Sequence, residues 1–136
     1  MAAFNEKLQA IFDDAESKAK IEVGSYVGTG TYGSSNPNTL TFGFEPKIVF
    51  VVGRVYLNLS NMATDFAVFN MTELRDEYLN AGYFEYSPES STSSSKDKYA
   101  KKNGNTLSWY SSKSNTYQMN GIWDGADSRY TYIAIG

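Results

Sequence analysis

The chain has 136 residues, a net charge of −3, no cysteine and no histidine. This length fits one domain with its own core, while the missing residue types exclude disulfides and thiolate metal sites and remove the commonest general base. The mild acidity argues against a nucleic-acid partner, which needs a concentrated basic face, and no apolar run approaches the roughly 18 residues of a membrane span.

Residues 1–20 predict one amphipathic helix. Phe4, Leu8, Ile11 and Ala15 recur at helical spacing, and neither Gly nor Pro interrupts the segment. Two interpretations stay open: the apolar stripe is a short coiled-coil seam between copies of the chain, or it lies on the chain's own domain. We favour the seam, so these residues are the expected oligomer interface.

Residues 21–136 predict a separate segment of strands and turns. Apolar residues alternate with small and polar ones over 39–44, which indicates a half-buried strand, and the apolar run at 48–52 suits a buried strand. Further strands are expected over 21–27, 65–71, 98–102, 106–111, 116–120 and 129–135, with a helical turn or a strand over 72–80. Residues 47–59 are expected to form one long strand or a pair of strands broken near Gly53. About eight short strands indicate an all-β fold, an antiparallel β-sandwich preceded by one α-helix.

Three loops are candidate contact surfaces, at 28–38, 87–95 and 121–128. Sugars bind aromatic faces backed by polar side chains, so Trp123 in the last loop is the first candidate for a glycan contact. Tyr117, Tyr32 and Tyr99 follow it.

Other aromatic residues are expected to serve the fold. Trp109 alternates within a strand and should lie in the core. Tyr130 and Tyr132 share one strand face, and we expect them to pack between subunits.

No motif indicates an enzyme. A glycan depolymerase needs two carboxylates about 5–10 Å apart, and the available pairs are Asp124 with Asp127 and Glu85 with Glu89. Acidic residues in turns usually bond to neighbouring backbone. We therefore expect no catalytic residue, no metal and no cofactor.

A basic cluster is formed by Lys96, Lys98, Lys101 and Lys102. It could attract anionic wall polymers or capsule, or it could protect an edge strand from aggregation, a common use of lysine. We favour protection of an edge strand.

Both ends of residues 21–136 resemble one protein family. Residues 24–37 read G-S-Y-V-G-T-G-T-Y-G-S-S-N-P, residues 42–47 read F-G-F-E-P-K, and residues 130–136 read Y-T-Y-I-A-I-G. These segments are similar to the opening, the corner and the closing strand of the C-terminal tip modules of tailed-phage and prophage tail-fibre proteins. N-T-L-S-W-Y at 105–110 is similar to their penultimate hairpin.

The resemblance implies a non-enzymatic virion protein. Such modules are β-sandwiches at the distal tip of a fibre, usually trimeric, and contact a receptor on the bacterial surface, here expected to be a glycan. Fibre tips normally end a long shaft, whereas only residues 1–20 precede this module, so the chain is either a small independent virion protein or a piece of a longer one. The alternative is a structural virion component, for capsid decoration or tail joining, whose helix docks on another virion protein.

Overall fold

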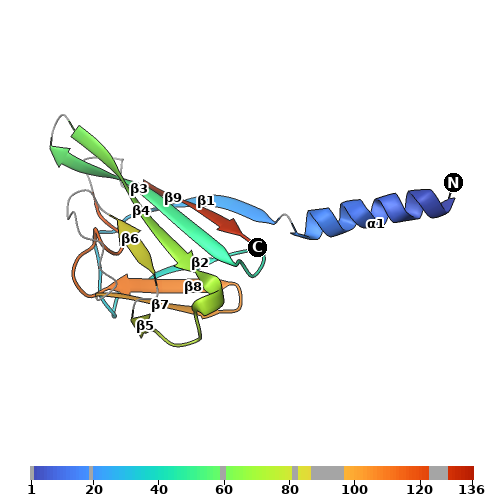
Figure 1. The fold of residues 1–136 in the computed structure, drawn as a ribbon. Helices are drawn as coiled ribbons and strands as arrows, with labels where there is room; N and C mark the ends of the chain where they lie inside the picture. The colour runs from blue at the N-terminus through green and yellow to red at the C-terminus, as the bar shows by residue number, and fades with distance from the viewer. Residues whose placement is uncertain (1, 19, 59–60, 81–82, 87–96, 123–128) are drawn as a thin grey trace.

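The computed structural model describes residues 2–18, 20–58, 61–80, 83–86, 97–122 and 129–136. Helix α1 (Ala2–Lys18) extends away from a β-sandwich, as Figure 1 shows. The strands are β1 (Ile21–Val27), β2 (Asn38–Thr41), β3 (Ile48–Asn58), β4 (Asn61–Asn70), β5 (Leu79–Asn80), β6 (Phe84–Tyr86), β7 (Lys98–Asn103), β8 (Thr106–Ser111) and β9 (Arg129–Ile135). The predicted fold class, an all-β sandwich preceded by one helix, is confirmed.

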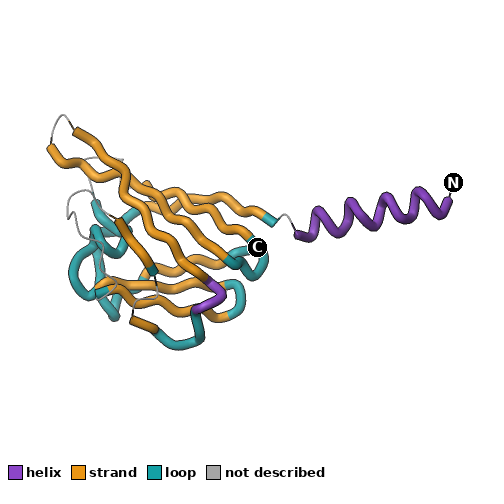
Figure 2. The backbone as a smooth tube through the Cα atoms, viewed as in Figure 1, coloured by secondary structure: helices purple, strands orange, loops and turns teal. Residues whose placement is uncertain are grey.

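The strands form two antiparallel sheets that face each other. The five-stranded sheet has the order β1-β9-β3-β4-β6, and the four-stranded sheet has the order β2-β8-β7-β5. Figure 2 shows the two layers with the helix outside them. Each sheet joins strands that are distant in the sequence, since β1 pairs with β9 and β2 pairs with β8.

The core lies between the sheets and is rich in aromatic rings. Trp109 of β8 is fully buried, and its ring lies 4.9 Å from that of Phe69 on β4. The ring of Tyr26 stacks on Tyr130 at 5.2 Å. Large buried rings supply much of the apolar area that stabilises a domain of this size.

Two aromatic predictions have different outcomes. The core position of Trp109 is confirmed. The expectation that Tyr130 and Tyr132 pack between subunits is wrong, because Tyr130 is only 1% exposed and Tyr132 packs against Phe42 within the same sandwich. Both rings point inward from β9 because alternate residues of a strand face the same side.

The predicted strand at 116–120 is wrong. Residues 114–121 form turns that close one end of the sandwich, and Met119 has a φ of 59°. A left-handed backbone of this kind cannot continue a strand. Elsewhere, 47–59 holds one strand, β3, and 72–80 holds the end of a 3₁₀ turn (Met71–Glu73) and the short β5.

The lysine cluster does not protect an edge. Strand β7 lies between β8 and β5, and Lys98 is only 1% exposed. Lys102 pairs with Glu45, their Nζ and Oε1 atoms being 3.2 Å apart. The alternation along β7 sends Lys98 inward and Lys101 outward, while Lys96 lies outside the described residues.

The helix leaves its apolar stripe open in a single copy. Phe4 is 64% exposed and Ile11 is 65% exposed, and Leu8 is also exposed. Ala15 belongs to the same helix, although its side chain lies outside the described part of the chain. The stripe therefore remains a candidate contact between molecules.

Replacing Gly53 with alanine should destabilise the sandwich. A Cβ at Gly53 would lie 2.4 Å from Cδ1 of Tyr130, so the buried ring would have to move. For Gly53→Ala we expect the free energy of unfolding to fall by about 1–3 kcal/mol, measured by urea denaturation. Gly43→Ala is the control, because Gly43 is exposed and its added Cβ would meet only the end of the Glu22 side chain. Equal losses in the two variants would contradict the close approach.

Candidate functional site

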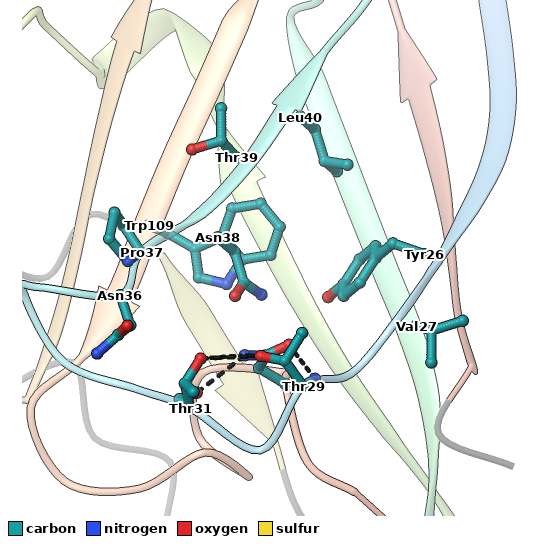
Figure 3. Close-up of a pocket in the computed structure, with 11 residues that line it drawn as sticks. Tyr26, Val27, Thr29, Thr31, Asn36, Pro37, Asn38, Thr39, Leu40 and Trp109 are labelled. Carbon is teal, nitrogen blue, oxygen red and sulfur yellow. Dashed lines mark hydrogen bonds between the residues drawn. The ribbon is translucent and has the colours of Figure 1, made fainter. Parts of the chain in front are cut away.

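A pocket of about 300 Å³ opens where the loop at 28–37 meets the turns at 114–121. This loop pocket lies between the edge strands β1 and β2 of the two sheets. Figure 3 shows Tyr26 pointing its hydroxyl toward Asn38, with the ring of Trp109 behind them. The pocket thus combines aromatic carbon with amide and hydroxyl groups, a mixture found in ligand sites.

The side chain of Gln118 connects the loop at 28–37 to the sandwich through hydrogen bonds. Its Oε1 accepts hydrogen bonds from the backbone N–H of Gly33 at 2.9 Å and of Ser111 at 3.0 Å. Its Nε2 donates to the carbonyl of Asn36 at 2.7 Å. Gln118 is fully buried, so these bonds are shielded from water and costly to lose.

Asn120 makes a second attachment at the mouth of the pocket. Its Nδ2 donates to the hydroxyl of Thr29 at 2.8 Å and to the carbonyl of Thr31 at 2.9 Å, while its Oδ1 accepts from the N–H of Thr29 at 3.0 Å. Gly28 permits this approach, because a Cβ there would lie 2.1 Å from the carbonyl oxygen of Gly121. The two amides hold the loop in one shape without a ligand.

Tyr26 forms a wall of the loop pocket and stays neutral. Its hydroxyl donates to the carbonyl of Met119 at 2.7 Å. Burial, and then the nearby Tyr130, raise the pKa of Tyr26 well above its usual value near 10. The hydroxyl therefore acts as a hydrogen-bonding group and not as an acid at neutral pH.

A second depression lies on the outer face of the four-stranded sheet. This polar hollow has a volume of about 430 Å³ and is lined by residues that include Asp76, Lys101 and Ser108. It adjoins the loop pocket across β2, because the hydroxyls of Thr39, which lines the loop pocket, and Ser108 are 3.1 Å apart. One hydrogen bond between β2 and β8 therefore links the two depressions.

Three tyrosines stand beside the polar hollow. The rings of Tyr99 and Tyr110 stack at 4.8 Å, and Tyr78 meets Tyr110 edge-on at 4.9 Å. The Nζ of Lys101 lies 4.9 Å from the centre of the Tyr78 ring. We call Tyr78, Tyr99 and Tyr110 the tyrosine cluster; mutual contact orders its rings before any ligand arrives.

The candidate residues from the sequence fall in separate places. Tyr99 belongs to the tyrosine cluster, and Tyr32 is 46% exposed in the loop at 28–37. Tyr117 lies beside two ammonium groups, at 5.3 Å from Lys98 and 5.1 Å from Lys113. Trp123 lies outside the described residues.

Several residues of this surface are not among those predicted from the sequence. Tyr110 follows the core residue Trp109 in β8, so alternation alone could have placed it outward. Tyr78 gives no such signal, because it precedes the two-residue β5. Gln118 falls within the predicted strand at 116–120, and nothing local marks it as a buried amide.

Acidic side chains are dispersed over the described residues. No three acidic side chains gather in the ranges that the structure covers, while Asp124, Asp127 and Glu89 lie outside those ranges. Among the same residues, no helix has the length and apolar character needed to cross a membrane.

No family model, curated protein or solved structure matches the chain. The surface formed by the loop pocket, the polar hollow and the tyrosine cluster is therefore the main indication of its function. This surface has ordered rings, many hydroxyls and no deep cleft, which suits an extended polar ligand.

Replacing Gln118 should loosen the loop pocket. Gln118→Ala would remove the partner of the buried N–H of Ser111 and of the half-buried N–H of Gly33, so we expect the free energy of unfolding to fall by about 2–4 kcal/mol. Urea denaturation measures the loss, and hydrogen exchange at Gly33 should become faster. Gln9→Ala, in the exposed helix, removes only a surface bond to Asp13 and serves as the control. A native exchange rate at Gly33 in Gln118→Ala would refute the attachment.

Alkaline pH should weaken the fold through Tyr26. The folded state favours the neutral hydroxyl because the pKa of Tyr26 is raised. The neutral hydroxyl of Tyr26 therefore stabilises the folded state in full below the pKa near 10 that Tyr26 has in the unfolded chain. This stabilisation is lost as the pH rises toward the higher pKa that Tyr26 has in the folded protein. We expect the urea midpoint to fall above about pH 10, and to fall less steeply in Tyr26→Phe. Parallel curves for both proteins would rule out this role of Tyr26.

Proposed function

We propose that the chain is a non-enzymatic virion protein of the tail-fibre-tip type that binds a bacterial surface glycan. The binding surface comprises the loop pocket, the polar hollow and the tyrosine cluster. The resemblance of residues 24–47 and 130–136 to tip modules supports the virion role, and the chemistry of the surface supports the ligand class.

The hydrogen bond between Thr39 and Ser108 carries the proposal. It joins two depressions of about 300 Å³ and 430 Å³ across one strand. Neither depression alone suits more than a small ligand, whereas a ligand that crosses the edge strand β2 at Thr39 would follow one track over both. A chain of sugars follows such a track more readily than a compact metabolite does.

The side chains along the track match both the apolar ring faces and the hydroxyl groups of a sugar. Ring C–H groups pack on aromatic carbon, which Tyr99 and Tyr78 provide, and sugar hydroxyls need donors and acceptors. Burial raises the pKa of Tyr78 and of Tyr110, so both phenols can donate and accept at neutral pH. Lys101 and Asp76 add one charge of each sign.

Assembly would strengthen a weak single site. We propose that α1 brings copies together as a homotrimer through Phe4, Leu8, Ile11 and Ala15. Three linked sites on a polysaccharide gain affinity from effective concentration. Rings that are ordered in advance also lower the entropy cost of binding.

The exposed stripe of α1 equally supports a second candidate function. In that alternative, the protein decorates a capsid or joins tail parts, and α1 docks on another virion protein. A particle reconstruction distinguishes the two, since a head or collar position excludes adhesion at a fibre tip.

The tyrosine cluster provides the test of glycan binding. Tyr99→Ala removes one outward ring, so we expect the single-site affinity for a glycan selected on an array to fall about tenfold or more. Calorimetry with a monovalent oligosaccharide measures it. Phe4→Ala is the control, because it truncates an exposed ring on α1 that lines neither depression, and it should bind the monovalent oligosaccharide as the native chain does.

Two results would contradict the proposal. One is the absence of binding to every bacterial glycan on the array and to host cells. The other is native affinity in Tyr99→Ala together with native affinity in Thr39→Val, which removes the hydroxyl between the two depressions.

A further inference from the structure

Strand β1 turns its branched apolar residues outward. Ile21, Val23 and Val27 are 63%, 64% and 58% exposed, whereas Gly24 and Tyr26 face the other sheet. The outer face of an antiparallel sheet normally carries polar residues, because water covers it. The alternation of β1 is the reverse of that pattern.

The apolar residues continue across the outer face of the five-stranded sheet. Pairing aligns Ile21 with Ile135 and Ile48 in one row. The next row aligns Val23 with Ile133, Phe50 and Val68, and a third brings Val52 beside Phe66. We call this surface the outer apolar face; its members are Ile21, Val23, Val27, Ile48, Phe50, Val52, Phe66, Val68, Ile133 and Ile135.

The outer apolar face is almost without charge. Among the described side chains that point from it, Arg129 alone is charged, and its guanidinium donates to the hydroxyl of Ser25 at 3.2 Å. Arg129 is the first residue of β9 and pairs with Val27, the last residue of β1, at one end of these two strands. Among the described side chains, the centre of the face therefore offers no ionic group to a partner.

We infer that the outer apolar face packs against the same face of further copies of this chain, with the sheets turned toward a common axis. An uncharged apolar face is complementary to itself, because two copies meet without burying an unpaired charge. A partner with charged groups would find no counterpart among the described side chains at the centre of the face. The inference rests on the proposed assembly of the chain and does not depend on glycan binding.

The size of the face agrees with a contact between copies. Rows about 6.7 Å apart on strands about 4.8 Å apart give a projected area of roughly 300–400 Å². Patches of this size on single chains often mark interaction sites, and a stable interface buries about 800 Å² per partner. The stripe of α1, on a helix roughly 25 Å long, supplies much of the remainder.

The helix and the face belong to one continuous part of the chain. Helix α1 ends at Lys18 and β1 begins at Ile21, and Figure 1 shows α1 directed away from the sandwich. In that arrangement α1 does not cover the face, so both apolar surfaces are open in one copy. Copies that share an axis bring both surfaces together in one assembly.

Charges placed on the face test the inference. Val23→Lys with Val52→Lys puts two ammonium groups on exposed positions of the full chain. We expect light scattering to give a trimer for the native chain, three times 15.1 kDa. The variant should give a folded monomer, with the dissociation constant raised about 100-fold or more. Ser34→Lys with Ser112→Lys adds the same charge at exposed loop positions and should stay trimeric.

A thiol probe gives a second measurement that does not depend on the lysine variant folding. The chain has no cysteine, so Val23→Cys introduces a single thiol at little change in volume. Its reaction with a maleimide should slow about tenfold or more when the protein is concentrated above its dissociation constant. Ser112→Cys should react equally fast at all concentrations.

Several outcomes would overturn the inference. If the folded variant with Val23→Lys and Val52→Lys keeps the trimeric mass, assembly depends on α1 alone. If the native chain is a monomer and the thiol of Val23→Cys reacts slowly at every concentration, its own helix covers the face. If the native chain is a monomer and that thiol reacts fast, the face is left to another protein. Calorimetry on the lysine variant separates this inference from the proposed function, because unchanged single-site glycan affinity leaves glycan binding intact.

Discussion

The buried amide of Gln118 is the constraint on which the pocket end of the sandwich depends. It bonds to the loop through Gly33 and Asn36 and to the four-stranded sheet through Ser111. Its backbone carbonyl also accepts the indole N–H of Trp109 at 2.7 Å. Since a buried polar group is costly without partners, the loop, the turn and the core ring must take their positions together. The shape of the loop pocket follows from that requirement.

The two outer faces of the sandwich differ in chemistry. The four-stranded sheet presents tyrosines, threonines and a lysine, whereas the five-stranded sheet presents isoleucine, valine and phenylalanine. An apolar face favours a dry contact between proteins, and a face with hydroxyls and rings favours a solvated ligand. With the apolar faces turned inward around an axis, the polar faces of the copies would point outward, where a long glycan can reach several of them.

Much of the fold was predictable from local pattern, and little of the site was. Alternation over 39–44 and the apolar run at 48–52 were sufficient for the sandwich, and Trp109 was correctly expected in its core. The run at 48–52 is buried on one side only, because Val49 and Val51 face the core whereas Ile48 and Val52 are exposed. The turn at 114–121 was not predictable, because the left-handed φ of Met119 depends on bonds to the distant loop. Of the proposed glycan contacts, Tyr99 alone lies in the tyrosine cluster; its neighbours Tyr78 and Tyr110 come from other parts of the chain.

The sequence by itself determined the class of fold, since the period of hydrophobic residues and the turn residues between strands act over a few positions. Only the tertiary structure decided which side of β1 faces the core. A Cβ at Gly24 would lie 2.3 Å from the ring of Tyr132, so Gly24 must point inward to admit that ring. Val23 must then point outward, because successive residues of a strand face opposite sides. The apolar outer face and the tyrosine cluster both arise from such pairings between distant strands, which no single segment encodes.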